Sequence, residues 1–161
     1  MSVTFRLDGQ TVDYHGRTDL SLTDILREDF GETATKSGCQ IGRCGACMVL
    51  MNGRPVNSCL LMAWQLDRAE IVTGAGLSDL PLASTIREAL VAENAFQCGY
   101  CAPGFVISLV GLFSQNPGAD EAEIRAALEG NPCRCTGYHS ILRGALSAAA
   151  ALRDAHRSGD L

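Results

Sequence analysis

The sequence lacks the marks of a membrane protein, an exported precursor or a nucleic-acid-binding protein. Its 161 residues contain no run of 18 or more apolar residues, so we expect no membrane span. The N-terminus alternates like a strand and shows no basic segment, no apolar signal core and no twin arginine. We therefore expect no export signal on this chain and a cytoplasmic location, unless a signal-bearing partner carries it out. The net charge of −5 disfavours nucleic acid as a partner.

Motifs of substrate chemistry are also missing. The sequence has no nucleophile–base signature, no G-x-G-x-x-G fingerprint and no phosphate-binding P-loop. We therefore expect no catalytic residue on this chain, and any chemistry to come from a bound cofactor.

Cysteine, in contrast, is abundant, with eight residues in the chain. Disulfides suit small secreted scaffolds that cannot build a sufficient core. This chain is 47% hydrophobic and 19% charged, which is typical of a packed globular protein that needs no such cross-links. The cysteine content therefore favours metal binding.

Half of the cysteines form one group, with the spacing C-x4-C-x2-C and a fourth cysteine after eleven further residues. The group consists of Cys39, Cys44, Cys47 and Cys59. Plant-type ferredoxins hold a [2Fe–2S] cluster with this arrangement. Gly38, Gly42 and Gly45 are expected to bend the loop through left-handed conformations and to bring backbone N–H groups near the cluster.

The remaining cysteines form a C-x2-C pair and a C-x-C pair, separated by 31 residues. They are Cys98, Cys101, Cys133 and Cys135. Each pair precedes a predicted helix, so the two loops can meet at one end of a bundle. From spacing alone, this second group suits either a second [2Fe–2S] cluster or an all-cysteine zinc site.

The first 75 or so residues predict short strands with one helix. Strands are expected at 3–7, 11–14, 48–51, 54–58 and 71–73. The dipeptides at 8–9 and 52–53 predict tight hairpin turns, and Pro55 predicts an edge strand. Ser21 and Asp24 have the pattern of a capping box at the start of the helix. Trp64, Met48, Met51 and Met62 are expected in the core.

The rest of the chain predicts helices. Residues 73–79 are expected to be a linker. Helices are expected at 82–92, from Pro103 to just before Asn116, after the capping-box pair Asp120 and Glu123, and at 139–157. Four helices joined by short loops predict an antiparallel bundle.

Taken together, the cysteine motifs resemble the small iron–sulfur subunit of the xanthine oxidase family of molybdenum hydroxylases. The motifs are residues 38–47 with Cys59, residues 97–104 (QCGYCAPG) and residues 131–138 (NPCRCTGY). The resemblance implies an α+β protein, with a β-grasp, plant-type ferredoxin-like domain at 1–76 and a four-helix-bundle domain at 77–161. It also implies a second [2Fe–2S] cluster, and not zinc, in the second cysteine group.

The same resemblance implies the electron-transfer subunit of a multi-subunit hydroxylase or dehydrogenase. Electrons would leave a molybdenum–pterin cofactor on a large subunit, pass the bundle cluster and then the ferredoxin-like cluster, and reach FAD on a medium subunit. Gln97 matches the glutamine that hydrogen-bonds the pterin, and Cys135 matches the cysteine beside it. The complex would be a dimer of heterotrimers, with the substrate chosen by the large subunit.

Two other functions stay open from the sequence. One is a free-standing two-cluster electron carrier, which the second cluster disfavours because a shuttle needs only one. The other is a zinc-binding interaction module. In each case Tyr100 and Tyr138 are expected to pack beside the metal sites and not to relay electrons, and His139 is expected at the surface.

Overall fold

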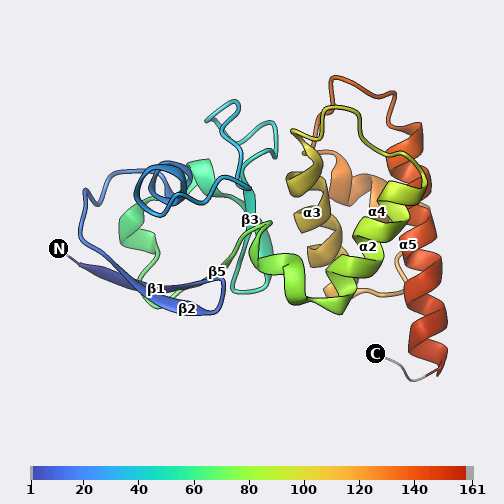
Figure 1. Ribbon diagram of the computed structural model, residues 1–161, viewed down its shortest axis with the longest axis horizontal. Coiled ribbons are helices and arrows are strands. Elements are labelled where there is room, and N and C mark those ends of the chain that lie inside the picture. The colour runs from blue at the N-terminus through green and yellow to red at the C-terminus, as the bar shows by residue number, and fades with distance from the viewer. Residues whose placement is uncertain (1, 159–161) are drawn as a thin grey trace.

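Two β-hairpins with left-handed turns build most of a sheet in the computed structural model, which describes residues 2–158 (Figure 1). The first joins β1 (Val3–Leu7) to β2 (Gln10–Tyr14), and the second joins β3 (Met48–Met51) to β4 (Arg54–Asn57). The turn residues have φ values of 48° and 83° at Asp8 and Gly9, and of 51° and 76° at Asn52 and Gly53. Positive φ at both central positions defines a type I′ turn, so both predicted hairpins are confirmed.

The fifth strand, β5 (Glu70–Val72), joins the hairpins into one sheet of order β2-β1-β5-β3-β4. It runs parallel to β1 and antiparallel to β3. β4 lies at the edge, as Pro55 predicts, because proline cannot donate a ladder hydrogen bond.

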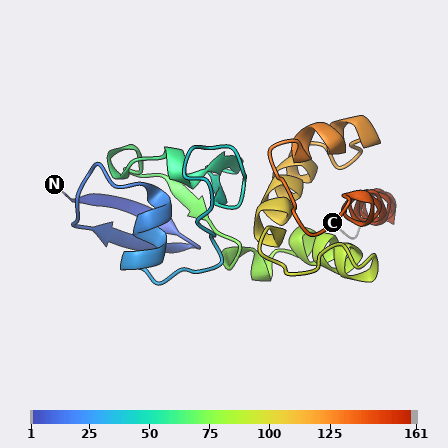
Figure 2. The ribbon, with the colours of Figure 1, turned by 90° about the horizontal axis from the view of Figure 1, so that it is seen from above.

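One face of the sheet is covered by α1 (Leu22–Asp24), which continues as a π-helical turn at Ile25–Asp29 (Figure 2). The Asp24 N–H donates to Ser21 Oγ at 3.2 Å, which confirms Ser21 as the N-cap. The Asp24 carboxylate accepts from the Ser21 hydroxyl at 2.7 Å instead of from its backbone. Only half of the predicted capping box therefore forms.

Trp64 does not lie in the core, where we expected it, and its side chain is 62% exposed. It belongs to the 3₁₀ helix η3 (Ala63–Gln65), which follows the 3₁₀ helix η2 (Ser58–Leu60). A 3₁₀ helix has three residues per turn, so Ala63 and Leu66 share one face. Both are fully buried, and Trp64 is left on the outer side. The three methionines at 48, 51 and 62 are half-buried.

The C-terminal half is an antiparallel four-helix bundle (Figures 1 and 2), which confirms the predicted fold class. Its helices are α2 (Pro81–Ala92), α3 (Ala102–Gln115), α4 (Glu121–Leu128) and α5 (His139–Ser158). The predicted capping box of α4 is complete, with 2.9 Å bonds in both directions between Asp120 and Glu123. Within the described part of the chain, no helix is long and apolar enough to cross a membrane.

The segment expected to be a linker is packed between the two halves. The Thr73 N–H and hydroxyl donate to the Asp8 carboxylate at 2.7 and 2.9 Å. The 3₁₀ helix η4 (Gly76–Asp79) follows, and its Leu77 is fully buried in the bundle core. Leu50 of β3 joins the same core from the sheet. The two halves are therefore held by shared apolar packing as well as by chain connection.

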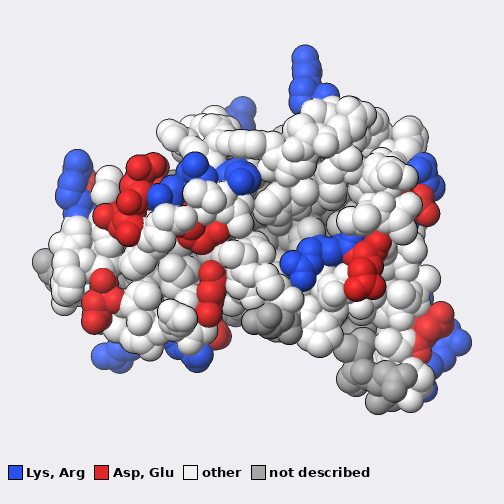
Figure 3. Space-filling model, viewed as in Figure 1, with Lys and Arg blue, Asp and Glu red and all other residues white. Residues whose placement is uncertain are grey.

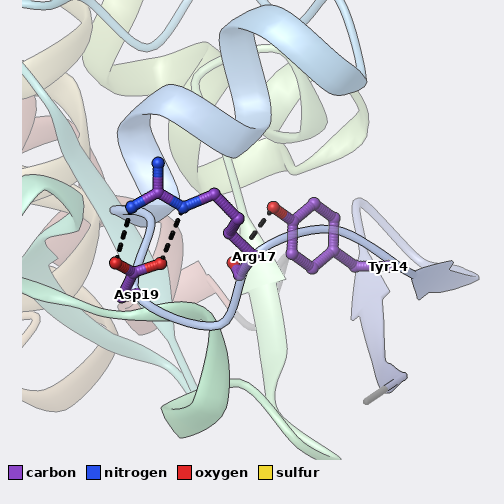
Figure 4. A network of polar contacts seen from close by, with 3 residues as sticks. All are labelled: Tyr14, Arg17 and Asp19. Atoms are coloured by element: carbon purple, nitrogen blue, oxygen red, sulfur yellow. Dashed lines mark hydrogen bonds and ion pairs between the residues drawn. The ribbon is translucent and has the colours of Figure 1, made fainter.

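At the β2 edge of the sheet, which is the edge opposite β4, a small polar network closes the loop after β2 (Figure 4). The Tyr14 hydroxyl donates to the Arg17 carbonyl at 3.2 Å. Arg17 pairs with both carboxylate oxygens of Asp19, at 3.0 and 2.7 Å. This tyrosine bond is separate from the cysteine loops.

We predict that Leu50→Ala destabilises both halves together, because it opens a cavity in the core that they share. The expected loss in free energy of unfolding is about 2–5 kcal/mol. Leu80→Ala, at a side chain that is 41% exposed, is the matched control and should change it by about 0.5 kcal/mol or less. Urea unfolding followed by circular dichroism measures both, and equal effects of the two variants would contradict the shared core.

Candidate metal centres

The first cysteine loop, residues 38–47, has no regular secondary structure and folds around its own sulfur atoms. The backbone N–H groups of Ile41 and Arg43 donate to Cys39 Sγ at 3.5 and 3.1 Å. The Cys39 N–H donates to Cys44 Sγ at 3.3 Å. Such donors stabilise the thiolate over the thiol, and the thiolate is the form that binds metal.

Glycine acts in this loop in two different ways. Gly42 and Gly45 have φ values of 73° and 61°, as predicted for left-handed positions. The same left-handed conformation was predicted for Gly38, and this prediction is wrong, because the φ of Gly38 is not positive. A Cβ at residue 38 would lie 2.7 Å from Cys44 Sγ. Glycine there leaves room for the sulfur.

The fourth cysteine of this group, Cys59, comes from η2, directly after β4. Its thiol lies in hydrogen-bonding range of the Cys47 thiol, and the Cys39 thiol is similarly close to Cys44. The structure therefore brings all four predicted residues together as two neighbouring pairs. Cys47 and Cys59 are buried, and the other two are half-buried.

The thiol pKa values in this group differ for clear reasons. The N–H groups of Ile41 and Arg43 lower the pKa of Cys39 to about 7. Burial, and next the Cys47 thiol, raise the pKa of Cys59 to about 11. The group thus contains one thiol that ionises near neutral pH and one whose ionisation is opposed by burial.

The second group is brought together by two loops at one end of the bundle. Cys98 and Cys101 precede α3, and Cys133 and Cys135 precede α5. The Cys98 and Cys135 sulfur atoms lie 3.4 Å apart, and Cys101 is in hydrogen-bonding range of Cys133. Burial, together with Cys133, raises the pKa of Cys101 to about 12.

The donor sets fit two-iron clusters. Each group is arranged as two close thiol pairs. A [2Fe–2S] cluster takes four cysteine thiolates, two on each iron. Two pairs per group, with backbone N–H groups aimed at sulfur, match that requirement.

The outer end of the bundle leaves part of the second group open to a partner. Cys98 and Gln97 are exposed, and Cys135 is half-buried. His139, the first residue of α5, is exposed as predicted. In Figure 3 the surface over this end is white apart from a basic side chain that projects from it, and the exposed Arg134 lies between Cys133 and Cys135. A free ligand-bearing edge of this kind can meet another protein.

Both tyrosines lie at the cysteine loops, and each uses its hydroxyl. The Tyr138 hydroxyl accepts from the Cys133 N–H at 2.8 Å, and the Tyr100 hydroxyl donates to the Ser37 carbonyl at 2.6 Å. Their side chains are 45% and 51% exposed, so neither is fully packed.

Sequence reasoning missed a buried polar pair beside the first loop. The Ser108 hydroxyl donates to Asn131 Oδ1 at 2.8 Å, and Asn131 Nδ2 donates to the Gly45 carbonyl at 3.4 Å. The only local signal was a serine in the otherwise apolar stretch of α3.

Comparison with known proteins agrees with this geometry. The family described as "2Fe-2S iron-sulfur cluster binding domain" matches residues 5–78, and the family described as "[2Fe-2S] binding domain" matches residues 73–146. The protein therefore has two [2Fe–2S]-binding domains in succession.

Individual relatives indicate more closely which class of iron–sulfur protein the chain resembles. The "Nicotinate dehydrogenase small FeS subunit" of Eubacterium barkeri is 38% identical over 93% of this chain and 98% of its own length. A probable xanthine dehydrogenase subunit of Bacillus subtilis is 42% identical over 86% and 80% of the two chains. A chain in the crystal structure of quinoline 2-oxidoreductase from Pseudomonas putida 86 superposes with a TM-score of 0.87, at 33% identity over 96% of both chains.

These likenesses confirm the predicted family. The chain belongs to the small iron–sulfur subunits of the xanthine oxidase family of molybdenum hydroxylases, and is thus a component of an oxidoreductase complex.

The metal-free protein should show a graded order of thiol reactivity. Because its pKa lies near 7, Cys39 should be largely thiolate above that pH and react faster with iodoacetamide at about pH 8 than Cys59 and Cys101 do. Cys59 and Cys101, with raised pKa values of about 11 and 12, should stay unreactive there. Mass-spectrometric mapping of the alkylated cysteines checks this, and equal labelling of all three would contradict the N–H-stabilised Cys39 thiolate.

Proposed function

We propose that this protein relays electrons from the molybdenum–pterin cofactor of a large subunit, through two [2Fe–2S] clusters, to FAD on a medium subunit. The observation that carries the proposal is the pairing of thiols in two separate groups, one in each domain. The clusters supply one-electron transfer when they are bound. The protein's own residues set where the clusters sit, what surrounds them and which partners approach.

We assign the ligands by proximity. Cys39, Cys44, Cys47 and Cys59 would hold the first cluster, and Cys98, Cys101, Cys133 and Cys135 the second. We place the domain boundary between residues 76 and 77, because Leu77 already belongs to the bundle core.

The second centre would face the large subunit. Gln97 and Cys98 are exposed at the open end of the bundle, and Cys135 lies in contact with Cys98. A side-chain amide offers both a donor and an acceptor, which suits the hydrogen-bonding edge of a pterin. We therefore propose Gln97 and Cys135 as the residues nearest that cofactor.

The first centre would face the flavin subunit. Ile41 of the first loop is 62% exposed and Leu60 beside it is 54% exposed. Leu60 packs on Gly42, so these apolar side chains lie over the loop that holds the ligands. Exposed apolar groups next to a functional site are typical of an interaction surface. The complete assembly would be a dimer of heterotrimers in the cytoplasm.

We expect Cys59→Ser to remove the first cluster and leave the second, because serine replaces a buried thiolate ligand. Iron per chain should fall by half, and one of the two EPR signals of the reduced protein should disappear. Cys133→Ser is the mirror-image control and should remove the other signal.

In a complex with the large and medium subunits, Cys59→Ser should also stop flavin reduction while molybdenum is still reduced. Stopped-flow absorbance with a panel of aldehydes and N-heterocycles measures this. Flavin reduction at the wild-type rate without the first cluster would contradict the proposed electron order.

Gln97→Ala should weaken assembly with the large subunit or electron entry from it, with both clusters intact. A single lost hydrogen bond corresponds to about a tenfold loss of affinity. Gln115→Ala, at an exposed glutamine on the other end of α3, is the matched control. Co-purification and binding titration decide, and identical behaviour of the two variants would remove Gln97 from the site.

A further inference from the structure

The first cysteine loop is held by the bundle at both of its ends. Before the loop, the Ser37 carbonyl accepts from the Tyr100 hydroxyl at 2.6 Å. Near its other end, the Gly45 carbonyl accepts from Asn131 Nδ2 at 3.4 Å. Figure 1 shows the loops that carry these groups along one edge of the molecule.

Both holding side chains come from the loops that carry the second cysteine group. Tyr100 lies between Cys98 and Cys101, and Asn131 lies two residues before Cys133. Each half of the second group therefore contributes one bond to the first loop. A displacement of either bundle loop would be transmitted to the first group through these bonds.

The Asn131 contact is buried and tightly confined. Asn131 and Ser108 are each 3% exposed, and the Ser108 hydroxyl fixes the amide by donating to Oδ1 at 2.8 Å. A buried amide must be satisfied, and in this orientation both its oxygen and its nitrogen have a polar partner. Gly104 also touches the Gly45 carbonyl so closely that a Cβ at Gly104 would clash with it.

The same amide reaches the strand that follows the loop. Asn131 Nδ2 lies 3.4 Å from Met48 Sδ, and the Ser108 hydroxyl lies 3.0 Å from that sulfur. One amide group thus contacts both the loop and the first residue of β3.

The Tyr100 contact is more exposed but doubly supported. Its hydroxyl makes the short bond to Ser37, and the Lys36 ammonium lies 6.0 Å from its ring centroid, within range of a cation–π attraction. Removing the hydroxyl alone would delete the bond and keep the ring in place.

We infer that Tyr100 and Asn131 are positioning residues that fix the spacing between the two cluster sites by clamping the first cysteine loop to the bundle. The inference rests on the proposed two-cluster relay. Electron transfer between clusters depends steeply on their separation, so the two side chains would set the rate of the internal step without touching either cluster's iron.

The test compares Tyr100→Phe, Asn131→Ala and the double variant of the complete, cluster-loaded chain. Tyr14→Phe is the matched control, since it also deletes a hydroxyl bonded to a backbone carbonyl. The first readout is deuterium uptake in residues 36–47. The second is the magnetic interaction between the two reduced clusters in EPR, which reports their separation.

We expect uptake in residues 36–47 to rise about fivefold for each lost bond, with no rise in the Tyr14→Phe protein. In the double variant, we expect the EPR splitting caused by the magnetic interaction between the clusters to become smaller or broader. A purely local role of Asn131 would loosen residues 131–135 but not the first loop, and that pattern would overturn the inference. An unchanged magnetic interaction at full iron content would also overturn it.

Two further outcomes keep the test decisive. If Asn131→Ala fails to load iron, Tyr100→Phe decides, because it leaves every buried group in place, and wild-type uptake in that variant would refute the clamp. If the wild-type chain itself carries iron for only one cluster, the proposed relay is refuted. Deuterium uptake in residues 36–47 would still show whether Tyr100 and Asn131 hold the first cysteine loop.

Discussion

Four sulfur atoms held close together repel one another once they ionise, and this constraint shapes both cysteine groups. Backbone N–H groups donate to the sulfur atoms of Cys39 and Cys44 and stabilise their negative charge. Cys47 and Cys59 are buried, which favours their neutral form. The result is one thiol that ionises readily beside another whose pKa is raised to about 11. In the proposed cluster, positively charged iron would offset the negative charge of these thiolates.

Bringing the sulfurs together requires the backbone to approach them closely. Gly38 leaves room for the Cys44 sulfur, and Gly45 lets the loop pass against Gly104 of α3. The hairpins, the bundle and their shared apolar core then act as a frame that carries the irregular cysteine loops in one fixed arrangement. Leu50 lies in β3 and Leu77 lies in the segment between the two halves, but both side chains pack in the core of the bundle. They therefore connect the two halves of this frame.

Much of this arrangement could be predicted from the sequence, because its signals are local. The turn dipeptides at 8–9 and 52–53 set left-handed turns, the pair Asp120 and Glu123 sets a helix start, and cysteine spacing groups the thiols. Trp64 was wrongly placed in the core because a 3₁₀ turn, and not a strand or α-helix, decides which side chain faces out.

The contacts between the two halves could not be predicted in the same way. The bond between Asn131 and Gly45 joins residues 86 positions apart, and that between Tyr100 and Ser37 joins residues 63 apart. No periodicity or cap marks such pairs. Only the packing of the whole protein shows that Ser108 of α3 bonds the Asn131 amide, which in turn contacts the first loop.

Metal analysis of the freshly isolated chain shows whether each cysteine group holds its own [2Fe–2S] cluster. We expect four irons and four acid-labile sulfides per chain, with two distinct EPR signals after reduction. Two irons or fewer in fully loaded protein, or zinc in the second group, would contradict it.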